Sequence, residues 1–320
     1  DISINAGLFD IAILAGTTDP NGIVHTGVTG GAASTGAADT QRISMVALPK
    51  NTALTMLLSG SIGYDPAVSA FDDGSSIVLT AGYDNGDPIA LPANTLGNIA
   101  MGGGLFGNAL TAYASNDITA SLNGGSIAFS GETLLHGLNA VTIEATNGAF
   151  ITAAGNLNVG AGSDGAGGTI ALSAIDGGEI AVASSLFLDA SSSSVPYLPS
   201  LALAAQGGSV TVLADNGSIT AINSFSANAG AFGGSDIANG GDGVAGSIDV
   251  SVINGGLLQG DFVDLSAQGI GGFSEGQGGN GTGGTVSLAD LGGTLDFNLV
   301  FLDASGRGGA TDAGTGGNGL

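Results

Sequence analysis

Carboxylates are the most numerous ionisable side chains in this chain and the first candidates for chemistry. Aspartate and glutamate number 27, against 3 lysines and arginines and 2 histidines. Two carboxylates facing each other in a cleft can hydrolyse a glycosidic bond, because one protonates the leaving oxygen while the other serves as base or nucleophile. The carboxylates that similar segments of the sequence could bring together are Asp189, Asp264, Asp303, Glu144 and Asp176.

These five carboxylates are better interpreted as outward polar residues on a solvated sheet. A polysaccharide lyase also needs a basic residue to remove a proton or to neutralise a uronate. The three basic residues, Arg42, Lys50 and Arg307, do not cluster on any repeat. Arg42 and Lys50 flank an apolar run, where a local ion pair with an acid of a neighbouring segment is the simpler expectation.

The histidines and serines offer no stronger catalytic site. His25 and His136 are isolated, without a second metal-ligating residue at helical or hairpin spacing, and are predicted to lie in loops or on the surface. Gly272–Gly276 reads GFSEG and matches Gly-x-Ser-x-Gly, but it lacks the preceding strand and following helix of a nucleophile elbow. The sequence therefore predicts no catalytic residue, and a protein that is not an enzyme.

Gly- and Asp-rich segments are the metal candidates. Gly233–Asp236 and Gly240–Gly243 are similar to the repeats of Ca²⁺-binding β-rolls. The Ca²⁺-binding nonapeptide is not repeated in register, however, and Ca²⁺ requires about six converging oxygen ligands. We expect flexible, solvated loops with no cofactor, and Ca²⁺ is the alternative. Phosphate binding is disfavoured because neither a helix nor a lysine accompanies the glycines.

Composition excludes several classes of partner. A net charge of −24 disfavours nucleic acids, whose phosphates need a basic surface, and anionic lipid headgroups for the same reason. The absence of cysteine excludes disulfides and thiolate metal sites. No apolar stretch reaches the roughly 18 residues of a membrane span. Hydrophobic residues make up 43% of the chain, which argues for a folded core despite 61 glycines.

A recurring turn must position all of these residues. Short β-type runs flank each of its copies, which are Asn147-Gly148, Asp176-Gly177, Asn216-Gly217, Asn254-Gly255 and Gly292-Gly293. A strand–turn–strand unit at a fixed period is typical of a solenoid. Helix signals are nearly absent. The most compact copies have three strands in about 24 residues, which is within the range of periods that solenoids use. The sequence thus predicts an all-β, right-handed parallel β-helix with three short strands per coil.

Later units are longer because Gly-rich segments follow the third strand of each coil. Their period is about 38 to 40 residues, still within the solenoid range. Their third strands begin near Leu186, Ser224, Phe262 and Phe301. Insertions confined to one corner should be extruded there and stack on one face. Residues 191–206, with Tyr197, could form a lid or an exposed apolar patch. A competing count divides each long unit into two 19-residue coils.

The periodicity also predicts which side chains stack in the core and how the chain is divided. One inward column should contain Ile180, Ile219, Leu257 and Leu295, and another Ile170, Val210, Ile248 and Val286. Residues 1–110 should form irregular coils, with a loop over 16–40, and residues 111–320 regular coils with Gly-rich insertions. We interpret 1–320 as one β-helix domain and as a fragment of a longer repeat array.

Several motifs together resemble filamentous haemagglutinin-like exoproteins. They are the GG[ST][IV]x[VL] strand starts, the Asn/Asp-Gly turns, the LDAS endings, the GTGGNG-type loops and the segments 42–51, 54–57 and 81–83. The resemblance implies a large β-helical protein that a Gram-negative bacterium exports by two-partner secretion, found outside the cell or on its surface. The secretion domain of the family is not evident here.

The resemblance further implies a structural adhesin whose partners are host or bacterial cell surfaces, glycans or matrix, with a role in biofilm. Two alternatives remain open at this point. Uncapped ends could let the chain assemble end to end into an extracellular filament. A polysaccharide-active β-helix enzyme would require a groove in which several carboxylates lie within about 5–10 Å of one another.

Overall fold

The computed structural model describes residues 109–194, 203–312 and 314–320, and before them the strands and adjoining residues 11–18, 24–30, 42–47, 54–58, 62–63, 76–81, 83–84, 87–88, 97–102 and 105–107. Throughout this part of the chain every regular element is a β-strand, and nearly all strand pairs are parallel. No described segment forms a helix long and apolar enough to cross a membrane.

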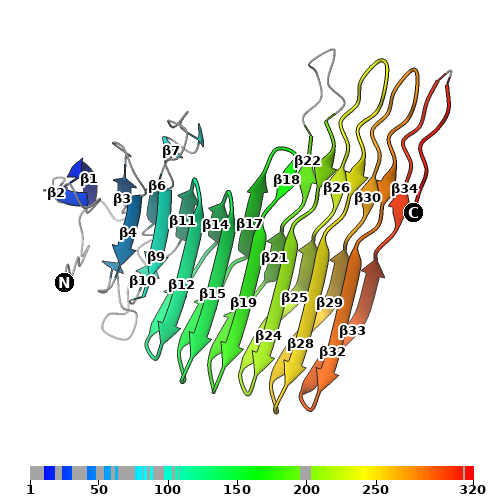
Figure 1. Ribbon diagram of the computed structural model, residues 1–320. Helices are drawn as coiled ribbons and strands as arrows, with labels where there is room; N and C mark the ends of the chain where they lie inside the picture. The colour runs from blue at the N-terminus through cyan, green and yellow to red at the C-terminus, as the bar shows by residue number, and fades with distance from the viewer. Residues whose placement is uncertain are drawn as a thin grey trace.

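One side of the molecule is an eight-stranded parallel sheet that receives one strand from each repeat of the chain (Figure 1). Compact repeats lie 23 residues apart, as the paired Ser121 and Glu144 do, and long repeats lie 38 residues apart, as Asp242 and Asn280 do. The strands of this sheet are β4 (Leu54–Leu58), β9 (Gly97–Met101), β12 (Asp117–Asn123), β15 (Ala140–Thr146), β19 (Thr169–Ile175), β24 (Ser209–Asp215), β28 (Ser247–Ile253) and β32 (Thr285–Leu291).

The remaining two sides belong to one large sheet. The second side contains β5 (Ile62–Gly63), β10 (Leu105–Gly107), β13 (Ser126–Phe129), β16 (Phe150–Ala153) and β20 (Glu179–Val182). The third side contains β3 (Arg42–Ala47), β6 (Ser76–Ala81), β11 (Ala109–Ala114), β14 (Thr133–Gly137), β17 (Leu157–Ser163) and β21 (Ser185–Asp189). In the last three repeats a single long strand serves both sides, namely β25 (Ser218–Asn228), β29 (Leu257–Ser266) and β33 (Thr294–Asp303).

The amino-terminal strands differ from the expected loop over 16–40. β1 (Ile11–Thr18) pairs in parallel with β3 and antiparallel with β2 (Val24–Gly30), so both 16–18 and 24–30 are strand. A short hairpin also joins β7 (Tyr83–Asp84) to β8 (Asp87–Pro88). The sequence did not reveal β2, because its glycines and threonines leave Val24 and Val28 as its only aliphatic residues.

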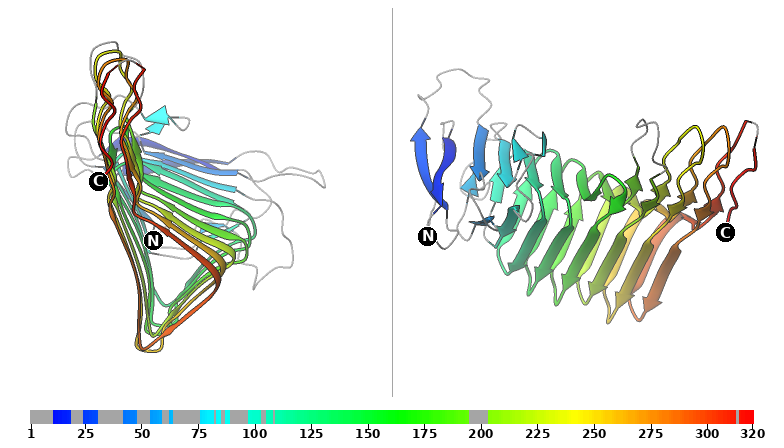
Figure 2. Two further views of the ribbon diagram at one scale, coloured as in Figure 1. Left: turned by 90° about the vertical axis from the view of Figure 1, so that its right-hand side faces the viewer. Right: turned by 45° about the horizontal axis from the view of Figure 1, so that its top comes forward.

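The Gly-rich insertions stack into a projecting plate, which we call the fin (Figures 1 and 2). We define it by residues 229–246, 267–284 and 304–320, together with the short strands Ala166–Gly167, Ser192–Ser193 and Ala205–Gln206 of the earlier repeats, which pair in the same stack. One leg contains β18 (Ala166–Gly167), β23 (Ala205–Gln206), β27 (Gly243–Val244) and β31 (Gly281–Thr282). The other contains β22 (Ser192–Ser193), β26 (Ala231–Phe232), β30 (Gly269–Ile270) and β34 (Gly306–Arg307). Extrusion from one corner is thereby confirmed.

The fin is not the set of solvated loops that the glycine content predicted. Its two legs are joined within each repeat, since the Gly241 amide donates to the Gly234 carbonyl at 2.7 Å. Successive repeats are joined as well, for the Gly272 amide donates to the Gly241 carbonyl at 2.8 Å. A Cβ added at Gly246 would overlap the carbonyl oxygen of Gly208, so backbone packs directly on backbone here. Neighbouring chains thus satisfy the backbone groups that a solvated loop would leave to water.

The same register excludes two 19-residue coils per long unit. Fin strands pair with fin strands one full repeat away, the interval of 38 residues that separates Asp242 from Asn280. No described strand of the long units pairs at half that interval. Each long unit is therefore one three-sided repeat that carries an outgrowth. Seen along the long axis, successive repeats superimpose on a three-sided outline with the fin at one corner (Figure 2).

One of the two predicted core columns is confirmed and the other needs a correction. Ile170, Val210, Ile248 and Val286 pair in one inward line. In the second column Ile219 pairs with Leu258, and Leu257 instead pairs with Ser218 on the outer face. An extra glycine, Gly256, lengthens the preceding turn by one residue relative to Asn216-Gly217. Because side chains alternate along a strand, that single residue exchanges the inward and outward positions.

The recurring turn is confirmed as a left-handed corner. Asn147, Asp176, Asn216 and Asn254 have φ between 49° and 53°, a conformation that asparagine and aspartate tolerate better than most residues. The Ala149 amide donates to the Thr146 carbonyl at 3.1 Å across the first of these turns, and Gly256 repeats the bond to Ile253 at 2.8 Å. Each turn redirects the chain from the eight-stranded sheet to the second side.

The interior is filled by aliphatic columns from all three sides. Phe225, Val263 and Leu265 are fully buried between their neighbouring repeats. Their counterparts in the last repeat, Val300 and Leu302, are 39% and 52% exposed because no described strand follows them. An all-β array of parallel, regularly repeating strands around an apolar interior is consistent with a β-solenoid.

Candidate binding face

Two of the candidate catalytic carboxylates cap the corner between the third side and the fin. The Asp189 Oδ1 accepts the Ser191 amide at 3.0 Å, and the Asp303 Oδ1 accepts the Ser305 amide at 2.9 Å. Asn228 fills the equivalent position and accepts the Gly230 amide at 2.9 Å. Hydrogen bonds from Ser305 lower the pKa of the Asp303 carboxyl. The LDAS endings are therefore accounted for by turn formation.

Of the other three candidate carboxylates, Asp264 lies near Asp303, and Glu144 and Asp176 lie on other parts of the repeat. Asp189 and Asp303 share a column, but Asn228 and Ser266 lie between them, so three strand spacings of about 4.8 Å separate them. Asp264 belongs to a neighbouring column, opposite Ser226 and Phe301. Glu144 accepts the Ser121 hydroxyl at 3.2 Å on the eight-stranded sheet, and Asp176 lies in a left-handed turn. Asp264 and Asp303 are diagonal neighbours on the adjacent strands β29 and β33, and neither carboxylate lines the groove described below.

Amide side chains alternate with many carboxylates along the repeats. The Asn254 Nδ2 donates to the Asp215 Oδ1 at 2.8 Å, and the Gln259 Nε2 donates to the Asp296 Oδ2 at 2.9 Å. Further bonds of this kind join Asn139 to Asp117, Asn158 to Glu132 and Asn298 to Asp261. This alternation keeps like charges apart in a chain with almost no basic residues.

The metal-ligand candidates Asp236 and Asp242 and the nucleophile candidate Ser274 all lie in the fin. There Asp236 accepts the Ile237 amide and Asp242 accepts the Asn280 amide, both at 2.6 Å. Among the described residues no group of three or more histidine, aspartate or glutamate side chains could hold a metal ion. Ser274 is buried in the fin, and its hydroxyl has no hydrogen-bond partner. No helix follows it in the described chain, which agrees with a chance match to the motif.

Several sequence candidates cannot be placed. His25 and Arg42 lie in described strands, but their side chains are outside the described part, and Lys50 and Tyr197 lie outside it altogether. Arg307 is on β34, paired with Ile270 in the fin and far along the chain from the other two basic residues.

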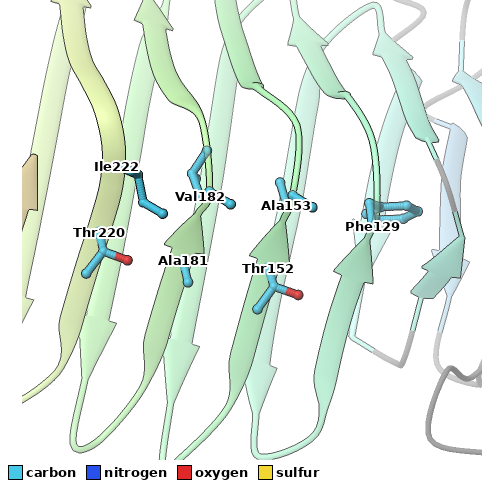
Figure 3. A pocket seen from close by; sticks show the side chains of 9 residues that line it. Phe129, Thr152, Ala153, Ala181, Val182, Thr220 and Ile222 are labelled. Carbon is cyan, nitrogen blue, oxygen red and sulfur yellow. The ribbon is translucent and has the colours of Figure 1, made fainter.

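A shallow groove of about 230 Å³ crosses four repeats where the second side meets the third (Figure 3). Small side chains create it: Ala181 and Ala183 lie between the larger Thr152 and Ile222. Its lining contains no charged residue. The groove therefore offers neither an acid nor a base for catalysis.

One outward column of the third side combines a phenol, an imidazole, a glycine and a carboxylate. Tyr113, His136, Gly160 and Asp189 occupy consecutive strands, β11, β14, β17 and β21. The Tyr113 and His136 rings are 6.2 Å apart between centroids and inclined at 60°. A Cβ added at Gly160 would lie 2.6 Å from the His136 Nδ1, so the imidazole occupies the space left by the missing side chain.

The environment of His136 favours the neutral form of its imidazole. Burial lowers the pKa of His136, and the nearby negative charge of Asp189 opposes this effect in part. A neutral imidazole can both donate and accept a hydrogen bond. Together with the Asp189 carboxylate, which is next to Gly160, the column presents two rings and two hydrogen-bonding groups on a rigid sheet.

Sequence reasoning missed this column. It placed His136 in a loop or on the surface, and the residue lies half-buried on the outward face of β14. Tyr113, His136 and Gly160 follow one another at the interval of the compact repeat. That interval would have aligned the three residues had it been applied to polar positions as well as to apolar ones.

Comparisons with known proteins do not add a relationship to this picture. No family model, no curated protein and no solved structure matches the chain.

Proposed function

We propose that the protein is a structural adhesin, secreted or held at the surface of a Gram-negative bacterium and similar to the filamentous haemagglutinin-like exoproteins. In this proposal the parallel strands wind as a right-handed β-helix, and the rod holds its fin and outer faces in fixed positions for partners. The observation that supports it best is the register: each long repeat adds one equivalent layer to both rod and fin. Such an arrangement is suited to display over an extended surface.

The distribution of chemistry on the outer faces supports binding more than turnover. Carboxylates are dispersed and bonded to amides or turn amides, and the groove is uncharged. Partners are expected to be cell surfaces, glycans or matrix, engaged through neutral contacts because the chain carries a net charge of −24.

A cell-binding assay with a fin-deleted variant tests the display role. Replacing 230–245 and 268–283 with the short connection found at Leu138–Asn139 should retain the rod, because the compact repeats close without an insertion. Binding by the full chain to immobilised cells or glycans supports an adhesin, and a change on fin deletion assigns the contact to the fin. Failure of the full chain to bind any cell, glycan or matrix component would contradict the proposal.

Assembly into an extracellular filament is the second candidate. Pairing of strands from one repeat to the next leaves a strand edge at each end of any such array, and unpaired edges are templates for further pairing. Electron microscopy of diluted protein separates the candidates: isolated rods of one length support the adhesin, and open-ended fibres support the filament.

A further inference from the structure

The third-side column Tyr113–His136–Gly160–Asp189 has the composition of a small-ligand site. It combines two rings, a neutral hydrogen-bonding nitrogen, a carboxylate and a glycine over which the imidazole lies. Parallel pairing fixes the spacing of these groups, with about 4.8 Å between successive members. Among the other residues whose side chains are described there is no histidine, and two rings, Phe262 and Phe301, form a pair 5.4 Å apart.

The neighbouring column extends the same surface. Asn158 and Phe187 are paired on β17 and β21, beside Gly160 and Asp189 respectively, and Phe187 is 38% exposed. The Asn158 Nδ2 donates to the Glu132 Oε1 at 2.7 Å, which fixes the amide in place. Gly160 is therefore covered by the imidazole along one column and flanked by a phenyl ring on its diagonal.

We propose that this surface, centred on Gly160, binds one uncharged pyranose residue of a glycan. The inference rests on the proposed function as an adhesin and names the place and class of its ligand. The C–H face of the sugar would pack on the rings of Phe187 and His136, where dispersion and burial of apolar area favour contact. Sugar hydroxyls would donate to the Asp189 carboxylate, and such charge-assisted hydrogen bonds are stronger than neutral ones.

Charge selects against acidic sugars at this position. Asp189 and Glu132 face the surface, and the one basic residue whose side chain is described, Arg307, lies in the fin three repeats beyond Asp189. A uronate or sialate would bring a third negative charge without a counter-ion. Neutral hexoses and N-acetylhexosamines do not incur this repulsion.

The chain supplies conservative variants for the test. Asp189→Asn keeps the corner, because Asn228 makes the same turn bond one repeat later. Gly160→Ser places a side chain where the His136 imidazole lies and should displace that ring. The same column already contains a serine, Ser266. Phe187→Ala removes an exposed ring. Matched controls are Phe232→Ala, an exposed ring in the fin, and Asp264→Asn, an outward carboxylate in the neighbouring column.

Binding is measured on immobilised neutral glycans that end in glucose, galactose or N-acetylglucosamine, with a sialylated glycan beside them. We expect the full chain to bind at least one neutral probe and not the sialylated one. Asp189→Asn, Gly160→Ser and Phe187→Ala should each weaken that binding by about tenfold or more, while both controls bind like the unmodified chain. Circular dichroism and thermal unfolding identify any variant that fails to fold, and the remaining variants then decide.

Three outcomes would overturn the inference: unchanged binding by folded site variants, equal weakening by the controls, or tighter binding of the sialylated probe. Cell binding that persists while no neutral glycan is bound also overturns it, but leaves the adhesin proposal in place. Loss of both kinds of binding removes both proposals.

Discussion

The rod and the fin obey one register but hold their layers together by opposite means. In the rod, successive repeats meet through columns of large side chains, such as Ile170, Val210 and Ile248, all essentially buried. In the fin, side chains are mostly missing at the contact, and carbonyl oxygens occupy the positions where Cβ atoms would lie. Apolar burial therefore stabilises the rod, and hydrogen bonds between closely packed backbones stabilise the fin.

Glycine content, accordingly, does not by itself indicate a flexible segment. Glycine costs conformational entropy on folding, so an ordered Gly-rich plate must be templated by something already ordered. The rod provides that template, because each fin leg starts from a capped corner, at Asp189, Asn228 or Asp303. Substitutions that affect only one of the two regions test whether they are held in these different ways.

The largest effect is expected from a core leucine of the rod. Leu258→Ala should destabilise the protein by about 2–5 kcal/mol, since it leaves a cavity in a fully buried column. The adjacent Leu257→Ala should cost less than about 1 kcal/mol, because its side chain is on the outer face. Urea unfolding of both variants measures the difference. Equal losses would contradict the register in which Leu258 follows Ile219.

A single methyl group should disrupt the fin locally and leave the rod intact. In Gly279→Ala the new Cβ would overlap the Gly241 carbonyl oxygen, whereas in Gly316→Ala the nearest atom, the Gly309 oxygen, is 3.7 Å away. Hydrogen exchange should show lost protection for the Gly241 and Gly317 amides in the first variant alone. Thermal unfolding of the rod should be little changed in either. Full protection in Gly279→Ala would mean that the fin is not closely packed.

The left-handed corner should give an intermediate effect. Asn254→Ala is expected to cost about 1–2 kcal/mol, because alanine tolerates a φ of 51° poorly and the bond to Asp215 is lost. Asn254→Gly loses the same bond but keeps the backbone conformation, so it should cost less. Denaturant midpoints of the two variants separate the contributions. Equal losses in the two variants would show that the amide bond, and not the backbone conformation, determines the corner.

The smallest effect is expected from the pH dependence of the rod. Burial lowers the pKa of His136 below its ordinary value of 6.5, so the unfolded chain binds a proton that the folded chain does not. Stability contributed by this residue should be complete above pH 6.5 and decline as the pH falls toward the lower folded pKa. Unfolding midpoints on either side of that pH measure it. His136→Gln should remove that part of the decline, and an unchanged slope would place the imidazole in water.

Much of the rod was predictable from the sequence, because its determinants are local. The Asn/Asp-Gly corners require left-handed residues, and β-branched runs between them alternate inward and outward, which was sufficient for the column from Ile170 to Val286. The error at Leu257 arose because one glycine in a turn changes the face of every following residue in the strand.

The fin and the candidate surface were beyond that reasoning. Order in the fin depends on contacts between successive repeats, such as the one from Asn280 to Asp242, for which a run of glycines carries no side-chain pattern. The surface near Gly160 depends on a residue without a side chain, because the His136 imidazole lies in the space that a side chain at Gly160 would fill. Asp189 and Asp303 were recognised as positions of interest, but their turn bonds follow from the local backbone and not from residue type.

The unequal length of the repeats has a mechanical consequence. A chain pulled from its ends would peel away one layer at a time, because each layer is bonded chiefly to the next. A compact layer of 24 residues would release about 80 Å of chain, and a layer of 38 residues with its plate about 130 Å. Under tension the molecule would therefore extend in short and long steps, and the layers that carry the plate would absorb more work for each layer lost.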